Sequence, residues 1–196
     1  DQITGVFNRN FDIDWQACDL AMDREWDTLV DPMDITETGD VATIANITRA
    51  FVEFEKIPEM DAFLAATLGS AAITNNMADS TALTAANILT QWDTYLAAMA
   101  DARVNRDRLV CYVTPATFKL LKEASGITRF IDAGTGIRSI DRNVGKLDGV
   151  RIVEVPSDLM KTAYDFTTGF VASQSAKQIN MLFVDTEAVV TPIVYE

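Results

Sequence analysis

Four carboxylates lie close together in the stretch RAFVEFEKIPEMDAF, residues 49–63: Glu53, Glu55, Glu59 and Asp61. If one continuous helix holds Glu55 and Glu59 at positions i and i+4, their Cβ atoms lie about 5–6 Å apart. Paired carboxylates at that separation are typical of a retaining glycoside hydrolase. The acids also have a structural interpretation, because anions are favoured in the first turn of a helix that restarts at Pro58. We adopt the structural interpretation and keep hydrolysis as the alternative.

Other patterns that could support chemistry are incomplete. The 196 residues contain no histidine, which excludes Ser-His-Asp and Cys-His catalysis and histidine metal sites within this chain. The stretch DITETGD, 34–40, begins like a calcium loop, but its twelfth position is Ala45 instead of a bidentate glutamate. The loop GTGIRS, 134–139, lacks the third glycine and the preceding strand of a dinucleotide site. We therefore predict no metal, no cofactor and no enzymatic activity.

The composition points away from nucleic acid and membranes. With 29 acidic and 16 basic residues the net charge is −13, so we predict no sequence-specific nucleic-acid binding. The densest basic stretch, RVNRDR at 103–108, is interpreted as a solvated helix end. No apolar run approaches about 20 residues, so no membrane span is predicted. Cys18 and Cys111 form no disulfide framework, and Cys111 within LVCYV is predicted to be a buried, inert thiol.

The first part of the chain predicts an extended segment followed by a long helix. FNRNFDIDW alternates apolar and acidic residues as a strand does, and DREWDTLVDPMDI predicts a second extended stretch with Pro32 at an edge or in an arm. Apolar residues then follow helical spacing from about 41 to 72, with Thr38 or Asp40 as the N-cap. Pro58 interrupts this pattern and predicts a bend or two helices end to end.

The second part predicts helices mixed with strands around one sheet, so the fold class is α+β. An amphipathic helix of about 19 residues is predicted within 81–102. LVCYV predicts a buried strand, followed by a helix with Thr114 as N-cap, Pro115 in its first position and a stop at Gly126. Asp148-Gly149 predicts a two-residue hairpin turn. Further strands are predicted in GFVAS (169–173), INMLFVD (179–185) and AVVTPIVY (188–195).

The order of these stretches resembles the major capsid protein of tailed bacteriophages, which has the Hong Kong 97-type fold shared with encapsulin shells. The collinear series that carries the resemblance is WQACDLAMDREWDTLVDPMDITETG, ANITRAFVEFEKIPEMDAF, TALTAANILTQWDTYLAAM, RLVCYVTPATFKLLKEA, NVGKLDGVRIVEVPSDLM and INMLFVDTEAVV. Each stretch alone has a pattern that is common in folded proteins, and the series spans nearly the whole chain.

The resemblance implies three parts. Residues 1–40 correspond to the extended loop, an arm that lies over a neighbouring subunit. Residues 41–80 correspond to the spine helix of the peripheral domain, with Pro58 as its structural bend. Residues 81–196 correspond mainly to the axial domain, with strands returning to the peripheral domain. Members of this family are normally longer, so the chain is expected to lack the N-terminal arm, one strand of the extended loop and the last strands. We predict inter-subunit contacts at Trp15, Trp26, Arg129 and Arg142.

The implied function is structural. The chain is expected to self-associate into the hexamers and pentamers of an icosahedral shell that encloses a phage genome, located in the virion and, during assembly, in the host cytoplasm. Its expected partners are copies of itself, with scaffold and portal proteins as further partners. Two alternatives stay open: an encapsulin-like compartment or other virion structural protein, and the less favoured carboxylate-based hydrolase.

Overall fold

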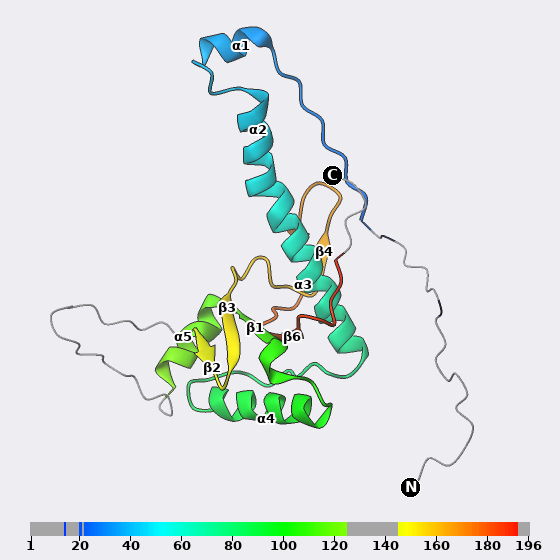
Figure 1. Cartoon of the computed structure of the whole chain (residues 1–196), viewed down its shortest axis with the longest axis vertical. Helices are drawn as coiled ribbons and strands as arrows, with labels where there is room; N and C mark the ends of the chain where they lie inside the picture. Colours follow the sequence, from blue (N-terminus) through cyan, green and yellow to red (C-terminus); the bar gives the residue numbers. More distant parts are fainter. Residues whose placement is uncertain (1–13, 15–19, 21, 125–144, 192–196) are drawn as a thin grey trace, which may run out of the picture. The chain divides into compact units, whose positions relative to one another are not determined.

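The structure is a computed structural model that describes residues 14, 20, 22–124 and 145–191 (Figure 1). The chain divides into two compact units, residues 1–46 and 47–196, and the boundary falls within helix α2 (Ile44–Phe51). The described residues form a mixed α+β fold, which confirms the predicted fold class at that level. No helix within the described ranges is long and apolar enough to cross a membrane.

The first unit contains the short helix α1 (Pro32–Glu37) where an extended stretch was predicted. Asp31 is extended, as expected before a proline, at φ −83° and ψ 130°. Its carboxylate accepts a hydrogen bond from the Met33 backbone N–H at 2.9 Å, so Asp31 is an N-cap and Pro32 begins a helix. The prediction of an extended segment is therefore wrong from Pro32 onward. FNRNFDIDW lies outside the described residues, apart from Asp14.

The predicted cap of the next helix is also wrong. Thr38 is the C-cap of α1, and Asp40 has a left-handed backbone with φ 66°. Helix α2 begins three residues later than the spacing indicated, and the Thr43 hydroxyl accepts a hydrogen bond from the Asn46 backbone N–H at 3.4 Å. Thr43, which directly precedes the helix, therefore takes the capping position that was predicted for Thr38 or Asp40.

The long helical run is continuous through Pro58. α2 is followed directly by the π-helical segment η1 (Val52–Lys56) and then by α3 (Ile57–Thr74). Lys56 and Ile57 both keep right-handed helical backbone angles. Pro58 has no N–H to donate, and the widened turn before it, in which the Ile57 N–H donates to the Val52 carbonyl, accommodates its ring. The run is one helix with an altered turn; a bend of its axis at Pro58 stays a prediction.

Helix α3 packs through small residues. Ala62, Ala65 and Gly69 are its buried positions, four or three residues apart on one face. A Cβ atom at Gly69 would lie 2.6 Å from Ile179 Cδ1, so the absent side chain permits a close approach. The Ser70 hydroxyl donates to the Thr162 carbonyl at 3.3 Å on the same side. These contacts hold α3 against the segment that carries the two-stranded sheet of β4 (Tyr164–Asp165) and β5 (Val171–Ala172).

The larger sheet has four strands in the order β2-β3-β1-β6. β1 (Leu109–Val113) pairs in parallel with β3 (Val150–Glu154) and antiparallel with β6 (Met181–Asp185). β2 (Lys146–Leu147) closes a hairpin with β3. In β1 alternate residues are fully buried, so it is a central strand with one fully covered face, whereas the continuous apolar run predicted burial on both faces.

The local signals around β1 and β3 are confirmed. Helix α5 (Pro115–Glu123) begins after the N-cap Thr114, whose hydroxyl accepts from the Thr117 backbone N–H. The predicted stop, Gly126, lies outside the described residues, and the helix ends before Ala124. Asp148 and Gly149 both have positive φ, 51° and 88°, which is the type I′ geometry that matches the twist of a hairpin.

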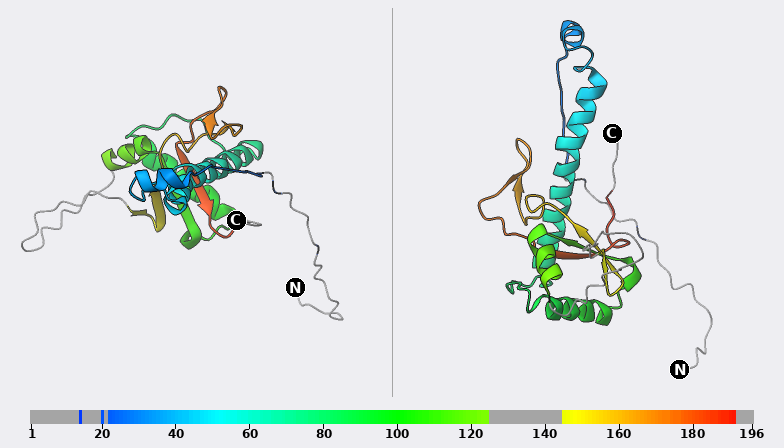
Figure 2. Two further views of the ribbon diagram at one scale, coloured as in Figure 1. Left: turned by 90° about the horizontal axis from the view of Figure 1, so that it is seen from above. Right: turned by 90° about the vertical axis from the view of Figure 1, so that its left-hand side faces the viewer.

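Helices α4 and α5 lie beside the larger sheet (Figures 1 and 2) and supply core residues together with β1 and β3. α4 (Ile88–Asp101) begins seven residues later than the predicted range, because the Asn87 side chain accepts from Thr84 N at 2.7 Å and donates to Ala82 O at 2.9 Å, which holds a turn there. The apolar face of α4 packs into the core, as the amphipathic pattern predicted. The core cluster comprises Ile88, Trp92, Leu96, Leu109, Cys111, Val113, Phe118, Leu121, Ala124, Val150 and Ile152.

Three further predictions differ from the structure, the first only in part. RVNRDR begins at a helix end, as predicted: the Arg103 N–H donates to the Ala100 carbonyl at 2.9 Å and the Val104 N–H to the Met99 carbonyl at 3.0 Å, which closes α4 with Arg103 at φ 63°. Its second half is not a helix end, because Arg106–Arg108 form the 3-10 turn η2. The strand β4 has no predicted counterpart. Of AVVTPIVY, the described part 188–191 contains no strand, and the rest lies outside the described residues. The strands predicted in GFVAS and INMLFVD are confirmed as β5 and β6.

Candidate functional site

The carboxylates that suggested hydrolysis lie along the helix without a shared cavity. Glu55 is exposed in η1, and Glu59 is half-buried in α3. Because the helix continues through Pro58, no helix N-terminus lies beside Glu59, and the predicted first-turn role of this acid is wrong. Partial burial raises the pKa of the Asp61 carboxyl above its ordinary value. The pair Glu55 and Glu59 does not line the groove formed farther along α3.

That groove is shallow and apolar, with a volume of about 370 Å³. The Phe63 and Phe166 rings meet edge to face with centroids 5.7 Å apart. Tyr164 is the titratable residue of the lining, and burial raises the pKa of its phenol. Its hydroxyl donates to the Asp158 carbonyl at 2.6 Å and accepts from Lys161 N at 3.0 Å, so it holds a loop in place. The groove is lined by Phe63, Ala66, Thr67, Ser70, Ala163, Tyr164 and Phe166.

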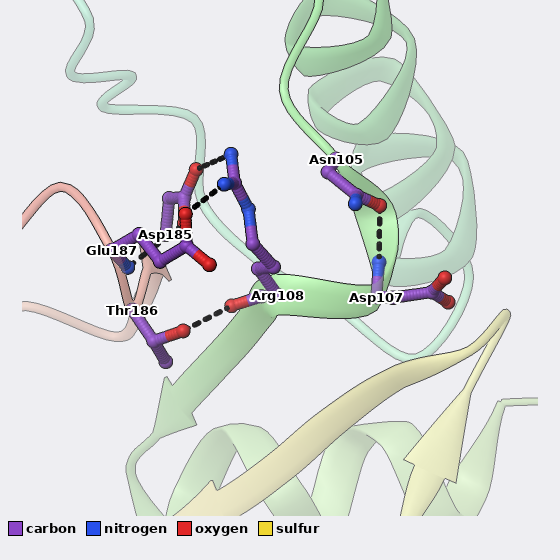
Figure 3. A network of polar contacts seen from close by, with 6 residues as sticks. All are labelled: Asn105, Asp107, Arg108, Asp185, Thr186 and Glu187. Atoms are coloured by element: carbon purple, nitrogen blue, oxygen red, sulfur yellow. Dashed lines mark hydrogen bonds and ion pairs between the residues drawn. The ribbon is translucent and has the colours of Figure 1, made fainter.

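A polar network joins the start of β1 to the end of β6 (Figure 3). The Arg108 guanidinium pairs with Asp185 at 3.0 Å and with Glu187. The Thr186 N–H and hydroxyl each donate to the Arg108 carbonyl at 3.2 Å. These bonds link residues of the same chain, so the network holds the start of β1 to the end of β6. The sequence predicted a solvated helix end for Arg108. It could not reveal the two carboxylates that bind this residue, because they lie 77 and 79 residues away along the chain.

The thiol and the acidic residues offer little chemistry. Cys111 is fully buried in the core, as predicted, and burial raises the pKa of its thiol above the ordinary range. A thiol that stays protonated is a poor nucleophile. Within the described ranges, no group of three or more histidine, cysteine or carboxylate side chains could hold a metal ion.

Exposed apolar side chains are the most distinctive feature. No described residue from Met22 to Asp61 is buried, and the first buried side chain along this stretch is Ala62. Leu29 is 98% exposed, and Phe54 is 68% exposed. Single exposed apolar side chains are common, so the feature that indicates a surface covered by another chain is their number along a stretch that buries none. The larger exposed apolar side chains of this stretch are Trp26, Leu29, Met33, Val41, Ile44, Phe54, Ile57 and Met60.

The residues predicted to contact other subunits fall mostly outside the described part. Trp15, Arg129 and Arg142 lie outside it. Trp26 is described and 43% exposed, on the stretch where no side chain is buried. The four predicted contacts therefore stay predictions. The sequence analysis did not predict contacts for the exposed aliphatic residues of the same stretch, of which Leu29 is the most exposed. They could have been found as apolar residues in an acidic segment that shows no helical or strand periodicity.

The comparisons give no relatives: no protein-family model matches this chain, and neither a curated protein nor a solved structure matches it.

Proposed function

We propose that this chain is a structural subunit of a self-assembling shell, of the kind formed by the major capsid proteins of tailed bacteriophages. One observation carries the proposal: the described stretch from Met22 to Asp61 buries none of its side chains while exposing several large apolar ones. Leaving such groups in water costs about 25 cal/mol for each Å² that a partner could cover. Copies of the same chain are the partner that the proposal names.

Two further features support the proposal. The collinear resemblance in sequence assigns residues 22–40 to the arm that lies over a neighbouring subunit and residues 41–61 to the spine helix that follows it. The rest of the chain supplies a small packed core around β1, which can anchor the exposed stretch. Contacts between arms and neighbours in a closed ring repeat by symmetry, so a modest interface energy is multiplied around the ring. Expected interface areas are at or above about 2,000 Å².

The proposed role includes further partners and a place of action. As a capsid subunit, the chain acts in the virion and, during assembly, in the host cytoplasm. Scaffold and portal proteins are its proposed additional partners. It needs no cofactor, acts by lateral contact instead of chemistry, and its negative charge keeps it from adhering to the enclosed genome.

The test is self-association of this chain and of the complete product of its gene. Sedimentation velocity across a range of concentrations, with negative-stain microscopy of the heaviest fraction, should show rings or closed shells. A strictly monomeric species under all conditions would contradict the proposal.

Matched variants sharpen this test. Leu29→Ser with Phe54→Ser removes two exposed apolar groups of the stretch and should weaken association about tenfold or more. Ile73→Ser with Met77→Ser removes two groups of similar exposure beyond it, 50% and 80%, and serves as the control. Because all four side chains are exposed, circular dichroism should show both double variants folded. Equal weakening in both would show that general surface hydrophobicity, and not this stretch, drives association.

A further inference from the structure

The hairpin of β2 and β3 carries two cations directly opposite each other. Lys146 and Arg151 are register partners, and both are exposed. The neighbouring position is hydrogen bonded, since Ile152 N donates to Gly145 O at 3.0 Å. Hydrogen-bonded and non-bonded pairs alternate in an antiparallel ladder, so Lys146 and Arg151 occupy a non-bonded pair, where side chains approach most closely. Like charges in that position destabilise a hairpin.

A third cation lies beside the same turn. Arg106 is exposed, and its Cδ atom lies 3.8 Å from the place that a Cβ atom of residue 149 would occupy. None of these three cations forms an ion pair with any residue of the described part of the chain. We call Arg106, Lys146 and Arg151 the cationic hairpin surface.

The carboxylates nearest in sequence form no ion pair with these three cations. Asp148, in the turn, accepts a hydrogen bond from the Trp92 indole at 3.2 Å. Asp107 forms no ion pair within the described ranges, and Glu154 lies at the far end of β3. Three exposed cations without ion pairs thus lie together in a chain whose net charge is −13. A partner that supplies carboxylates would relieve the repulsion between Lys146 and Arg151.

The chain itself contains a segment of complementary charge. Residues 22–40 hold seven carboxylates and one cation, Arg24, and we call them the acidic segment. Its carboxylates are Asp23, Glu25, Asp27, Asp31, Asp34, Glu37 and Asp40. No residue of this segment is buried, so its charges are accessible to a partner.

We propose that the cationic hairpin surface of one copy binds the acidic segment of a second copy. The inference rests on the proposed self-association and names one of its contacts. Such a contact is heterologous, joining two different surfaces, and heterologous contacts repeat head to tail into rings or filaments. Charge complementarity of this kind steers encounter and sets register, and it weakens as salt shortens the screening length from about 10 Å at 0.1 M to about 3 Å at 1 M.

The experiment is a charge swap read by sedimentation velocity at low salt. Lys146→Glu with Arg151→Glu should weaken self-association about tenfold. Glu25→Lys with Asp27→Lys, both in non-helical backbone, should weaken it similarly. An equimolar mixture of the two variants should regain association, because the unchanged hairpin of one variant can bind the unchanged acidic segment of the other. The control, Lys161→Glu with Lys177→Glu, changes the net charge equally at positions beside the two-stranded sheet and should have no such effect.

Zero-length carbodiimide crosslinking supplies a readout that does not depend on association strength. In a mixture of light and heavy-isotope copies, mass spectrometry should find mixed crosslinks from Lys146 to carboxylates of residues 23–40. Absence of mixed crosslinks would overturn the inference.

The remaining outcomes separate the two proposals. If the chain associates but neither charge reversal nor the mixture changes it, this inference is wrong and the shell proposal stands. If the chain is always monomeric and no mixed crosslink forms, both are wrong. If a single-stranded DNA 30-mer added as a probe binds the chain, and Lys146→Glu with Arg151→Glu abolishes that binding while self-association is unchanged, the surface recognises phosphate and the inference is again overturned.

Discussion

The indole N–H of Trp92 donates a hydrogen bond to the carboxylate of Asp148 across 3.2 Å. This bond joins helix α4 to the left-handed turn between β2 and β3, 56 residues farther along the chain. Trp92 is fully buried and its ring lies 4.8 Å from that of Phe183, so the tryptophan connects the helix to both edges of the sheet.

Replacing Asp148 tests how much this bond contributes. Asp148→Ala removes the acceptor, leaves a buried indole N–H without a partner, and places alanine at φ 51°. We expect a loss of about 2–3 kcal/mol in the free energy of unfolding, measured by urea denaturation. Asp148→Asn keeps both an acceptor and a residue suited to this turn, so its loss should stay below about 1 kcal/mol. Equal losses in the two variants would contradict this role.

The N-cap of α5 is a second point of local stability. Thr114 is buried, and its hydroxyl lies 2.9 Å from the Thr117 hydroxyl while accepting from the Thr117 backbone N–H. Thr114→Ala removes both interactions and should cost about 1–2 kcal/mol of unfolding free energy. Thr114→Ser keeps the hydroxyl and should cost less. A thermal-unfolding comparison in which serine is as harmful as alanine would assign the effect to the methyl group instead of the cap.

Close packing at Gly69 predicts sensitivity to size. A leucine there would meet the Ile179 side chain, whose Cδ1 already lies 2.6 Å from the position of a Cβ atom. We expect Gly69→Leu to lower the free energy of unfolding by about 1–3 kcal/mol through overpacking. Ala71→Leu, on the exposed side of α3, is the matched control and should change it by less than about 0.5 kcal/mol. Similar values for both would show that α3 does not depend on this contact.

The elements that could be predicted from the sequence have determinants close together along the chain. Thr114 and Pro115 specify the start of α5 within a few residues of β1, and Asp148-Gly149 specifies its turn by itself. Both signals act through backbone angles that few other residues favour, so tertiary context has little power to override them.

The elements that could not be predicted depend on competing local bonds or distant partners. At the start of α4, the Asn87 side chain bonds two backbone groups of the preceding turn, which apolar periodicity does not reveal. The role of Arg108 depends on the pairing of β6 with β1. The cationic hairpin surface depends on the register of β2 and β3, which places Lys146 opposite Arg151. For the stretch from Met22 to Asp61, the resemblance predicts an arm that ends at residue 40, whereas the exposure of Leu29 and Phe54 is known only from the structure.

The buried thiol of Cys111 predicts a pH dependence of stability. Burial raises its pKa in the folded protein, whereas the unfolded thiol ionises near pH 8.5. The protonated form is therefore favoured by folding: the full contribution is present below about pH 8.5, and stability is lost as the pH rises above it. Between about pH 9 and 10, the Cys18→Ser variant should lose about 1.2 kcal/mol more unfolding free energy than the same variant carrying Cys111→Ala. Parallel pH profiles would show that the thiol ionises freely when folded.

The Arg108 network predicts unequal effects for its two carboxylates. The Asp185 side chain is 15% exposed and the Glu187 side chain is 67% exposed, so water screens the second ion pair much more than the first. Asp185→Asn leaves the half-buried guanidinium with a weaker acceptor and should cost about 1–2 kcal/mol of unfolding free energy. Glu187→Gln should cost less than about 0.5 kcal/mol. Neither change removes the backbone ladder between β1 and β6. The Asp185 Oδ1 atom also accepts from the Glu187 backbone N–H at 3.0 Å, so urea denaturation of Asp185→Asn reports this bond together with the ion pair. A larger loss for Glu187→Gln would place the main energetic contact at the exposed end of the network and would contradict the burial argument.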